Sequence, residues 1–317
     1  MTRRTLWAYG LFLVILGMGW GLTQPLAKLA VSTGHGPIGL IFWQMVIGAI
    51  VLGLVSLVRG KGVPWTPAAL LSSILIALIG TVIPNSASYT AIAYLPSGVI
   101  SILLSLVPMM AFPIALGLGL ERFSPRRLAG LAIGLTGVML LVLPEASLPD
   151  RAMLAWIPLA LLAPLCYAFE GNYVARWGTG GLDPIQTLFG ASLAGAAISL
   201  PLAIFSDQFI SPLRPWEIAE WALVASSLIH AVVYTGYVWL VGRAGPVFAV
   251  QVSYLVTGFG VIFAMLLLGE RYSPFIWLAM MLVLAGVFLV QPKRRAATDE
   301  RLAPAAAIGE TGDQAEQ

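Results

Sequence analysis

The pentapeptide Glu-Arg-Phe-Ser-Pro at residues 121–125 returns almost unchanged as Glu-Arg-Tyr-Ser-Pro at residues 270–274, 149 positions later. Further matches flank this pair at nearly the same offset: Gly137 with Gly286, Val138 with Val287, Gly34 with Gly181, Pro37 with Pro184 and Gly48 with Gly195. The chain therefore consists of two related halves of about 150 residues each. Both halves are strongly apolar, and duplication in an apolar chain is typical of membrane proteins built from structural repeats.

The composition indicates an integral membrane protein. Of the 317 residues, 10% are charged and 59% are hydrophobic, and the mean hydropathy is +0.92. A soluble domain carries roughly 25% charged residues, which it needs to cover its surface. The net charge of +3 does not indicate nucleic acid, because the basic residues lie in short loops and not on one face. One cysteine and two histidines argue against an intrachain disulfide and a conventional metal site, so we expect no cofactor.

Apolar stretches of spanning or near-spanning length alternate with short loops rich in glycine and proline. They cover residues 7–31, 38–58, 70–94, 98–120, 127–144, 155–176, 185–205, 220–241, 246–268 and 274–291. The first stretch follows two arginines and could pass for a signal peptide, but it is about 25 residues long and lacks a small-x-small cleavage site. It also has a counterpart in the second half. We therefore predict an all-α integral membrane protein with ten transmembrane helices.

The distribution of positive charge predicts the orientation. If both termini lie in the cytoplasm, the cytoplasmic loops hold 13 of the 17 lysines and arginines, and the outer loops hold only Arg151, Arg214 and Arg271. Each half then contains five helices, and because five is odd, the second half enters the membrane from the opposite side. We expect a multi-pass protein of the cell membrane. Its predicted units are a first repeat over 1–148, a second repeat over 149–292 and a disordered cytoplasmic tail over 293–317.

Several short pieces of the chain share their order and spacing with one known family. They are Trp20-Gly21 with Pro25 and Lys28; Ala91, Tyr94, Pro96 and Gly98; Pro108; the run from Gly119 to Arg122 with Gly130 and Gly137; and Gly269-Glu270-Arg271 with Gly286. Across roughly residues 5–292 the chain thereby resembles the EamA-like branch of the drug/metabolite transporter superfamily. The resemblance implies a ten-helix secondary transporter with cytoplasmic termini, often an exporter of amino acids or other small metabolites. Members commonly carry an arginine early in the second helix, where this chain has Gln44, so no particular substrate is implied.

Glu170 is the first candidate for a solute-binding side chain. It lies about 5 Å from the middle of its apolar stretch, a depth at which carboxylates are costly and usually functional. Tyr167 and Tyr173 flank it at three-residue spacing and share one side of a helix with it. The alternative is a structural carboxyl group that is protonated or bonded to a neighbouring helix. Because Lys28 lies about 13 Å outside the mid-plane, we expect no direct salt bridge between Lys28 and Glu170.

Other polar and aromatic side chains at membrane depth complete the predicted site. His230, near the middle of its stretch, either relays a proton or bonds a solute, or makes a plain hydrogen bond to another helix. Lys28 either receives a substrate carboxylate at the outer mouth or acts as an interfacial or helix-joining lysine. The remaining candidates for solute contact are Trp20, Asn85, Tyr89, Tyr234, Gln251 and Tyr254. For small polar residues the alternative role is to join helices.

These features predict a secondary transporter that moves a small polar or amphipathic metabolite by alternating access between the two halves. An intramembrane enzyme would need carboxylates and histidines clustered at one interface, whereas Asp150, Asp183 and Asp207 are scattered among loops on both sides. A channel would need rings of equivalent charges in an oligomer. We expect a small-molecule substrate, a lipid-bilayer environment, no nucleic-acid partner and no enzymatic activity, with a homodimer left open.

Overall fold

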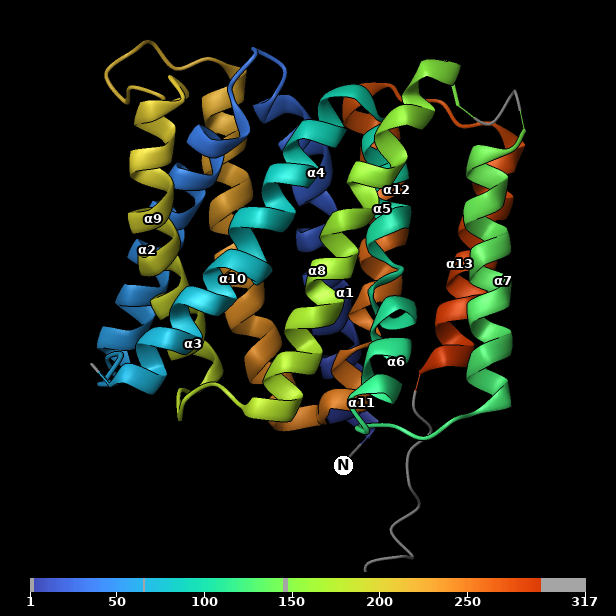
Figure 1. Ribbon diagram of the computed structural model, residues 1–317, viewed down its shortest axis with the longest axis horizontal. Coiled ribbons are helices and arrows are strands. Elements are labelled where there is room, and N and C mark those ends of the chain that lie inside the picture. Colours follow the sequence, from blue (N-terminus) through green and yellow to red (C-terminus); the bar gives the residue numbers. More distant parts are fainter. Residues whose placement is uncertain (1–2, 65, 145–147, 292–317) are drawn as a thin grey trace, which may run out of the picture.

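The computed structural model describes residues 3–64, 66–144 and 148–291 (Figure 1). All regular structure in these ranges is helical. The elements are α1 (Arg3–Ala30), α2 (Pro37–Val58), α3 (Pro67–Ala77), η1 (Leu78–Val82), α4 (Ile83–Tyr94), α5 (Ser97–Leu104), α6 (Val107–Gly117), α7 (Pro125–Val142), η2 (Arg151–Trp156), α8 (Ile157–Trp177), α9 (Pro184–Phe205), α10 (Ile218–Ala244), α11 (Pro246–Ala249), α12 (Val252–Leu268) and α13 (Pro274–Val290). The tail predicted over 293–317 lies outside the described residues.

Eight helical segments among the described residues are long and apolar enough to cross a membrane. Some are composites: α3, η1 and α4 run together over Pro67–Tyr94, and α5 continues into α6 over Ser97–Gly117. The last two helices, α12 and α13, are apolar but shorter, with 17 residues each. The chain is therefore a multi-pass membrane protein, because segments of this length and composition are stable in hydrocarbon.

A proline explains the irregular centre of the third apolar stretch. Pro84 lacks the N–H that would bond the Gly80 carbonyl, and its ring crowds that carbonyl. The chain widens there into the π-helical turn η1, in which the Ile83 N–H bonds the Leu78 carbonyl five residues back. This turn contacts α8. The widened segment therefore places Gly80 beside the helix that carries Glu170.

Helices of the first half pack mainly on helices of the second half. In the first set of contacts, α1 lies against α10 and α12, and α8 lies against α4 and α6. In addition, α2 and α3 pack on α9, α10 packs on α2, and α7 pairs with α13 along one side of the bundle (Figure 1). This pattern is unchanged when each element is exchanged for its counterpart in the other half: α1 for α8, α2 for α9, α3–α4 for α10, α5–α6 for α11–α12, and α7 for α13.

Glycines permit the close contact between α7 and α13. A Cβ atom built on Gly286 would lie 2.6 Å from the Gly130 carbonyl oxygen, and one built on Gly137 would lie 2.9 Å from the Ala279 carbonyl oxygen. No side chain fits at such distances. Small residues of this kind let helix backbones approach closely in membranes, where packing stabilises helix pairs.

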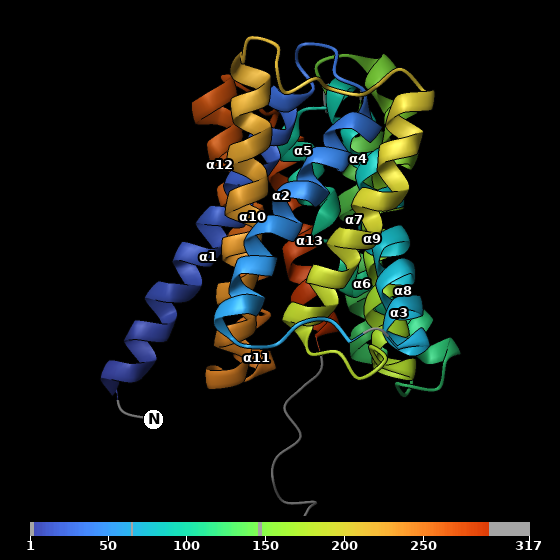
Figure 2. The ribbon, with the colours of Figure 1, turned by 90° about the vertical axis from the view of Figure 1, so that its left-hand side faces the viewer.

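The first turns of α1 lean away from the other helices (Figure 2). Trp7, Leu11 and Ile15 are exposed there. The apolar surface of this part of α1 is suited to contact with lipid. We call the end of the bundle where α1 begins the near end and the opposite end the far end (Figure 1).

Candidate functional site

A chain of side-chain hydrogen bonds links three helices inside the bundle. The Tyr167 hydroxyl of α8 donates to Oδ1 of Asn85 in α4 at 2.9 Å. The Asn85 amide in turn donates to Oε1 of Gln44 in α2 at 2.9 Å, and the Tyr89 hydroxyl donates to the same oxygen at 3.2 Å. The structure thus brings together three of the predicted site residues, and Gln44 joins them. We call these four residues the polar network.

Glu170 lies one helical turn along α8 from Tyr167 and faces the π-helical turn. A Cβ atom on Gly80 would lie 2.5 Å from Oε1 of Glu170 and 2.7 Å from its carboxyl carbon. Only glycine therefore leaves room for the carboxylate at this point. Because the π-helical turn results from Pro84, the proline and the glycine together create the position of the acid.

The Glu170 carboxylate has no hydrogen-bond or ion-pair partner among the described residues. The ammonium of Lys28 instead bonds the carbonyls of Ile92, Ala93 and Leu95. Glu170 as a whole is half-buried. A carboxylate held among helices without a partner is costly. A polar or charged solute that bonds the Glu170 carboxylate relieves that cost.

Aromatic rings gather on the neighbouring side, between α1 and α10. The Trp20 ring centroid lies 6.1 Å from that of His230, 6.5 Å from that of Tyr234 and 5.3 Å from that of Tyr237. We call these four residues the aromatic cluster. The Trp20 indole N–H is buried and has no hydrogen-bond partner. Tyr234 lies within electrostatic reach of Glu170, so the cluster and the carboxylate adjoin one site.

Lys28 lies toward the far end of α1 and is fully engaged there. Its ammonium donates to the carbonyls of Ile92 at 2.5 Å, Ala93 at 3.1 Å and Leu95 at 3.0 Å. These carbonyls end α4, where a helix carries partial negative charge and unsatisfied acceptors. The arrangement matches the helix-joining alternative for Lys28 and leaves it no donor directed at the polar network.

Three other predicted site residues lie apart from these groups. Tyr173 packs on Trp177 near the end of α8, with ring centroids 5.5 Å apart. Gln251 is exposed in the turn before α12. Tyr254 packs against the apolar core that includes Val261, and its hydroxyl is buried without a partner. Within the described part of the chain, no side-chain hydrogen bond or ring contact joins these three residues to the polar network or the aromatic cluster.

Sequence reasoning missed one residue of the site, Gly80, and undervalued two others, Gln44 and Tyr237. Gln44 drew attention only as a departure from a family pattern, and its role follows from Asn85 and Tyr89. Tyr237 shares a helix face with His230 and Tyr234 at three- and seven-residue spacing, which was a usable signal. Gly80 had no signal in the local sequence, because its importance depends on a side chain 90 positions away.

A second carboxylate holds the far end of the bundle together. Glu270, between α12 and α13, accepts hydrogen bonds from the Ser97 N–H at 2.8 Å, the Ser97 hydroxyl at 3.1 Å and the Gly98 N–H at 3.3 Å. The Tyr272 hydroxyl also donates to it. Burial, together with this carboxylate, raises the pKa of Tyr272, so the hydroxyl remains a donor. Glu270 thus caps the first turn of α5, and we call these four residues the Glu270 clasp.

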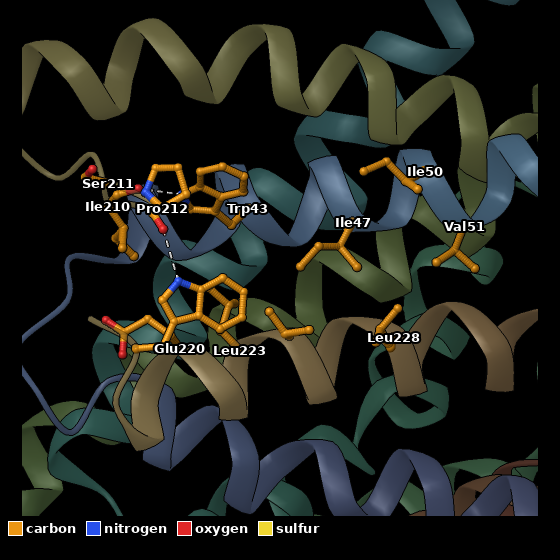
Figure 3. A pocket seen from close by; sticks show the side chains of 12 residues that line it. Trp43, Ile47, Ile50, Val51, Ile210, Ser211, Pro212, Glu220, Leu223 and Leu228 are labelled. Atoms are coloured by element: carbon orange, nitrogen blue, oxygen red, sulfur yellow. Dashed lines mark hydrogen bonds between the residues drawn. The ribbon is translucent and has the colours of Figure 1, made fainter. Parts of the chain in front are cut away.

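An apolar groove opens on the side of the bundle between α2 and α10 (Figure 3). Its volume is about 290 Å³, and its lining includes Trp43, Ile47, Ile50, Val51, Ile210, Leu223 and Leu228. Glu220 is the one charged residue of the lining, and it is bonded to His35 at 2.8 Å and to Arg214 at 3.4 Å. The groove thus offers no free charged group to a polar solute. We therefore take the polar network, Glu170 and the aromatic cluster as the candidate site.

The fold and the site define a class: a helical multi-pass membrane protein with duplicated halves and a polar centre. Comparison with known families narrows the class. The sequence profile of the EamA-like transporter family matches residues 7–143 and again residues 154–291. The two matches cover most of the chain, and the protein belongs to the EamA-like transporter family.

Comparison with solved structures agrees on the fold. Among the 25 chains that match is a crystal structure described only as that of a protein. It is 20% identical in sequence, covers 88% of this chain and 97% of its own, and superposes with a TM-score of 0.61. At that identity the likeness shows the fold alone. No curated protein matches this chain.

Proposed function

We propose that the protein is a secondary active transporter that exports amino acids or other small metabolites by alternating access. In this proposal ten membrane crossings form two inverted repeats, over 1–148 and 149–292, and the chain lies in the cell membrane with both termini in the cytoplasm. Membership of the EamA-like transporter family supports transport. The excess of lysine and arginine in the loops assigned to the cytoplasm supports the orientation. The export direction rests on the family resemblance.

The observation that carries the proposal is the symmetry of the helix packing, which is unchanged when the helices of one half are exchanged for their counterparts in the other. Each contact between the halves has a counterpart in which the two halves exchange roles. For example, α1 of the first half packs on α12 of the second, and α8 of the second half packs on α6 of the first. Two related halves with reciprocal contacts can adopt two arrangements of nearly equal energy, open to one side or to the other. Five crossings per half would relate these arrangements by an axis in the membrane plane.

The candidate site has the location that such a mechanism needs. Gln44, Asn85 and Tyr89 come from the first half, whereas Tyr167 and Glu170 come from the second. A solute bound to these residues contacts both halves, so its binding energy can bias their relative arrangement. The aromatic cluster likewise joins Trp20 of the first half to α10 of the second.

Reconstitution in proteoliposomes tests the proposal. We expect the wild-type protein to exchange at least one member of a broad panel of labelled metabolites across the vesicle membrane. Failure with every member, in vesicles that contain folded protein, would contradict it. Side-specific labelling of single cysteines introduced at positions 61 and 295 tests the inverted topology, because both must react from the cytoplasmic side.

A glycine pair tests whether the site belongs to the transport route. Gly80→Ala forces the Glu170 carboxylate to move, since the new Cβ would lie 2.5 Å from its oxygen. We expect a loss of transport of more than about tenfold, equivalent to about 1.4 kcal/mol. Gly171→Ala is the matched control. It lies beside Glu170 in the same helix, its Cβ would meet nothing within 4 Å, and we expect normal transport.

A further inference from the structure

The candidate site has an acidic side chain without a partner, whereas the basic side chains nearest to it are engaged elsewhere. Glu170 has a carboxylate without a partner, while Lys28 is held by three carbonyls at the end of α4. Farther along α8 toward the near end, Arg176 lies six residues beyond Glu170, or about 9 Å along the axis. Its guanidinium is stacked 5.9 Å from the Trp177 ring. Among the described residues, the site therefore presents an acidic side chain without a hydrogen-bond or ion-pair partner and no free cation.

We propose that this site binds solutes with a protonated amine beside an aromatic or other apolar group, and that it disfavours free carboxylates. The inference rests on the proposed function, because it treats the polar network, Glu170 and the aromatic cluster as the solute site, and it narrows the proposed solutes from amino acids to other small metabolites that carry an amine. An ammonium group placed against Glu170 supplies a counter-charge that no described side chain provides. An ammonium beside this half-buried carboxylate lowers the cost of its charge, because it adds an opposite charge and donates charge-assisted hydrogen bonds to the carboxylate oxygens.

The aromatic cluster supplies the second half of the recognition. Trp20, Tyr234 and Tyr237 offer π faces, and tryptophan attracts cations more strongly than the other aromatic side chains do. Tyr234 and Glu170 interact electrostatically, so a solute whose amine bonds the carboxylate has its apolar group directed toward the rings around Trp20. The apolar part of the solute then packs among the rings between α1 and α10.

An amino acid would bring a carboxylate into the same site. That group would find Glu170 as a like charge and no free cation, so its desolvation would go uncompensated. The polar network offers only neutral donors: one amide hydrogen of Asn85 and the hydroxyl hydrogens of Tyr89 and Tyr167 are donated within it, and the remaining amide hydrogens of Asn85 and Gln44 carry no charge to offset that of a carboxylate. The charge of the solute, more than its shape, should therefore decide binding.

Three probes of similar shape isolate the effect of charge: 2-phenylethylamine, phenylalanine and 3-phenylpropionate. Binding to the purified full-length protein is measured by calorimetry and by the ligand-dependent rise in melting temperature. We expect the amine to bind at least tenfold more tightly than either other probe. Equal or tighter binding of phenylalanine or phenylpropionate, or no binding of the amine up to millimolar concentration, overturns the inference.

Variants then test the residues. Glu170→Gln should weaken binding of 2-phenylethylamine at least tenfold, and Trp20→Leu should weaken it about fivefold. Glu121→Gln is the control, because that carboxylate is paired with Arg127 at 2.9 Å outside the site, and its affinity should equal that of the wild type. Unchanged amine binding in a folded Glu170→Gln protein would refute the assignment. If that variant does not fold, Trp20→Leu decides, and unchanged amine binding in it refutes the assignment equally.

The transport assay separates this inference from the proposed function. If 2-phenylethylamine binds but crosses no proteoliposome membrane, the transport proposal fails and the binding site stands. If the vesicles move phenylalanine and the protein does not bind the amine, the transport proposal stands and the inference fails.

Discussion

The two copies of the repeated pentapeptide make different contacts at the two ends of the bundle. At the far end, Glu270 reaches across to the other half and caps the first turn of α5 through Ser97 and Gly98. At the near end, the equivalent Glu121 pairs with Arg127, which belongs to its own half. Nearly identical sequences thus serve different roles, because the helix ends that face them differ.

The two ends also differ in how the halves are tied together. The far-end tie, between Glu270 and α5, is partly buried and uses several donors on one carboxylate. The near-end tie joins Arg59 to Asp183 at 2.8 Å, with exposed side-chain fractions of 34% and 25%. Buried hydrogen bonds to a charged group contribute more than exposed ion pairs do. The far end should therefore be the more firmly closed end in this conformation, and the following substitutions test that difference.

Glu270→Ala should have the largest effect. It removes the acceptor for two backbone N–H groups and two hydroxyls, and we expect a loss of about 3 kcal/mol of stability. Glu121→Ala, the equivalent change at the near end, should cost less than about 1 kcal/mol, because it removes one ion pair whose carboxylate side chain is 38% exposed. Thermal unfolding in detergent measures both. Equal shifts in melting temperature would break the comparison.

Lys28→Met should come next, because it removes the cation that satisfies three carbonyls at the end of α4. We expect a loss of about 2 kcal/mol, with solute affinity unchanged. Lys61→Met is the near-end control: its amine lies 3.9 Å from Asp183 and is largely exposed, so no measurable change is expected. A stable Lys28→Met protein with abolished binding would instead make Lys28 a solute ligand.

The aromatic position of the pentapeptide offers a reciprocal swap. Tyr272→Phe deletes the hydroxyl that donates to Glu270, and we expect a loss of about 1 kcal/mol. Phe123→Tyr adds a hydroxyl to an exposed ring at the near end and should be neutral. Melting temperatures of the two single variants measure the asymmetry directly. A larger effect from Phe123→Tyr would be inconsistent with it.

The near-end tie predicts a small pH effect. Hydrogen bonds from Arg59 lower the pKa of Asp183 below its usual value. A lowered pKa adds stability above the unfolded-state value of about 3.9, and that stability is lost as the pH falls below it. At pH 7 the free energy of unfolding of Asp183→Asn should therefore be lower than that of the wild type, by about 0.5 kcal/mol or less given the solvent exposure. Its melting temperature should be slightly lower as well. The gap should narrow as the pH falls below the unfolded-state pKa of about 3.9, and a gap that widens on acidification would contradict the assignment.

The local pattern predicted much of the fold and part of the site. Apolar length identified the eight described segments that are long enough to cross a membrane and two shorter apolar helices. The family resemblance is confirmed by the matching profile. Depth and polarity singled out Asn85, Tyr89, Tyr167 and Glu170, which the structure gathers between α2, α4 and α8. The same reasoning selected Tyr173, which packs instead on Trp177, because three-residue spacing also moves a side chain along the helix toward its end.

What the sequence by itself determined is the set of helices and the duplication, because a chain this apolar must satisfy its backbone hydrogen bonds within each segment. The tertiary structure alone decided the partners. Lys28 bonds carbonyls 64 to 67 positions away, and Glu270 caps the N-terminus of helix α5, 173 positions away. The sequence offers Glu121 and Glu270 nearly equal surroundings. Only the packing of whole helices determines which of the two finds a helix end to cap.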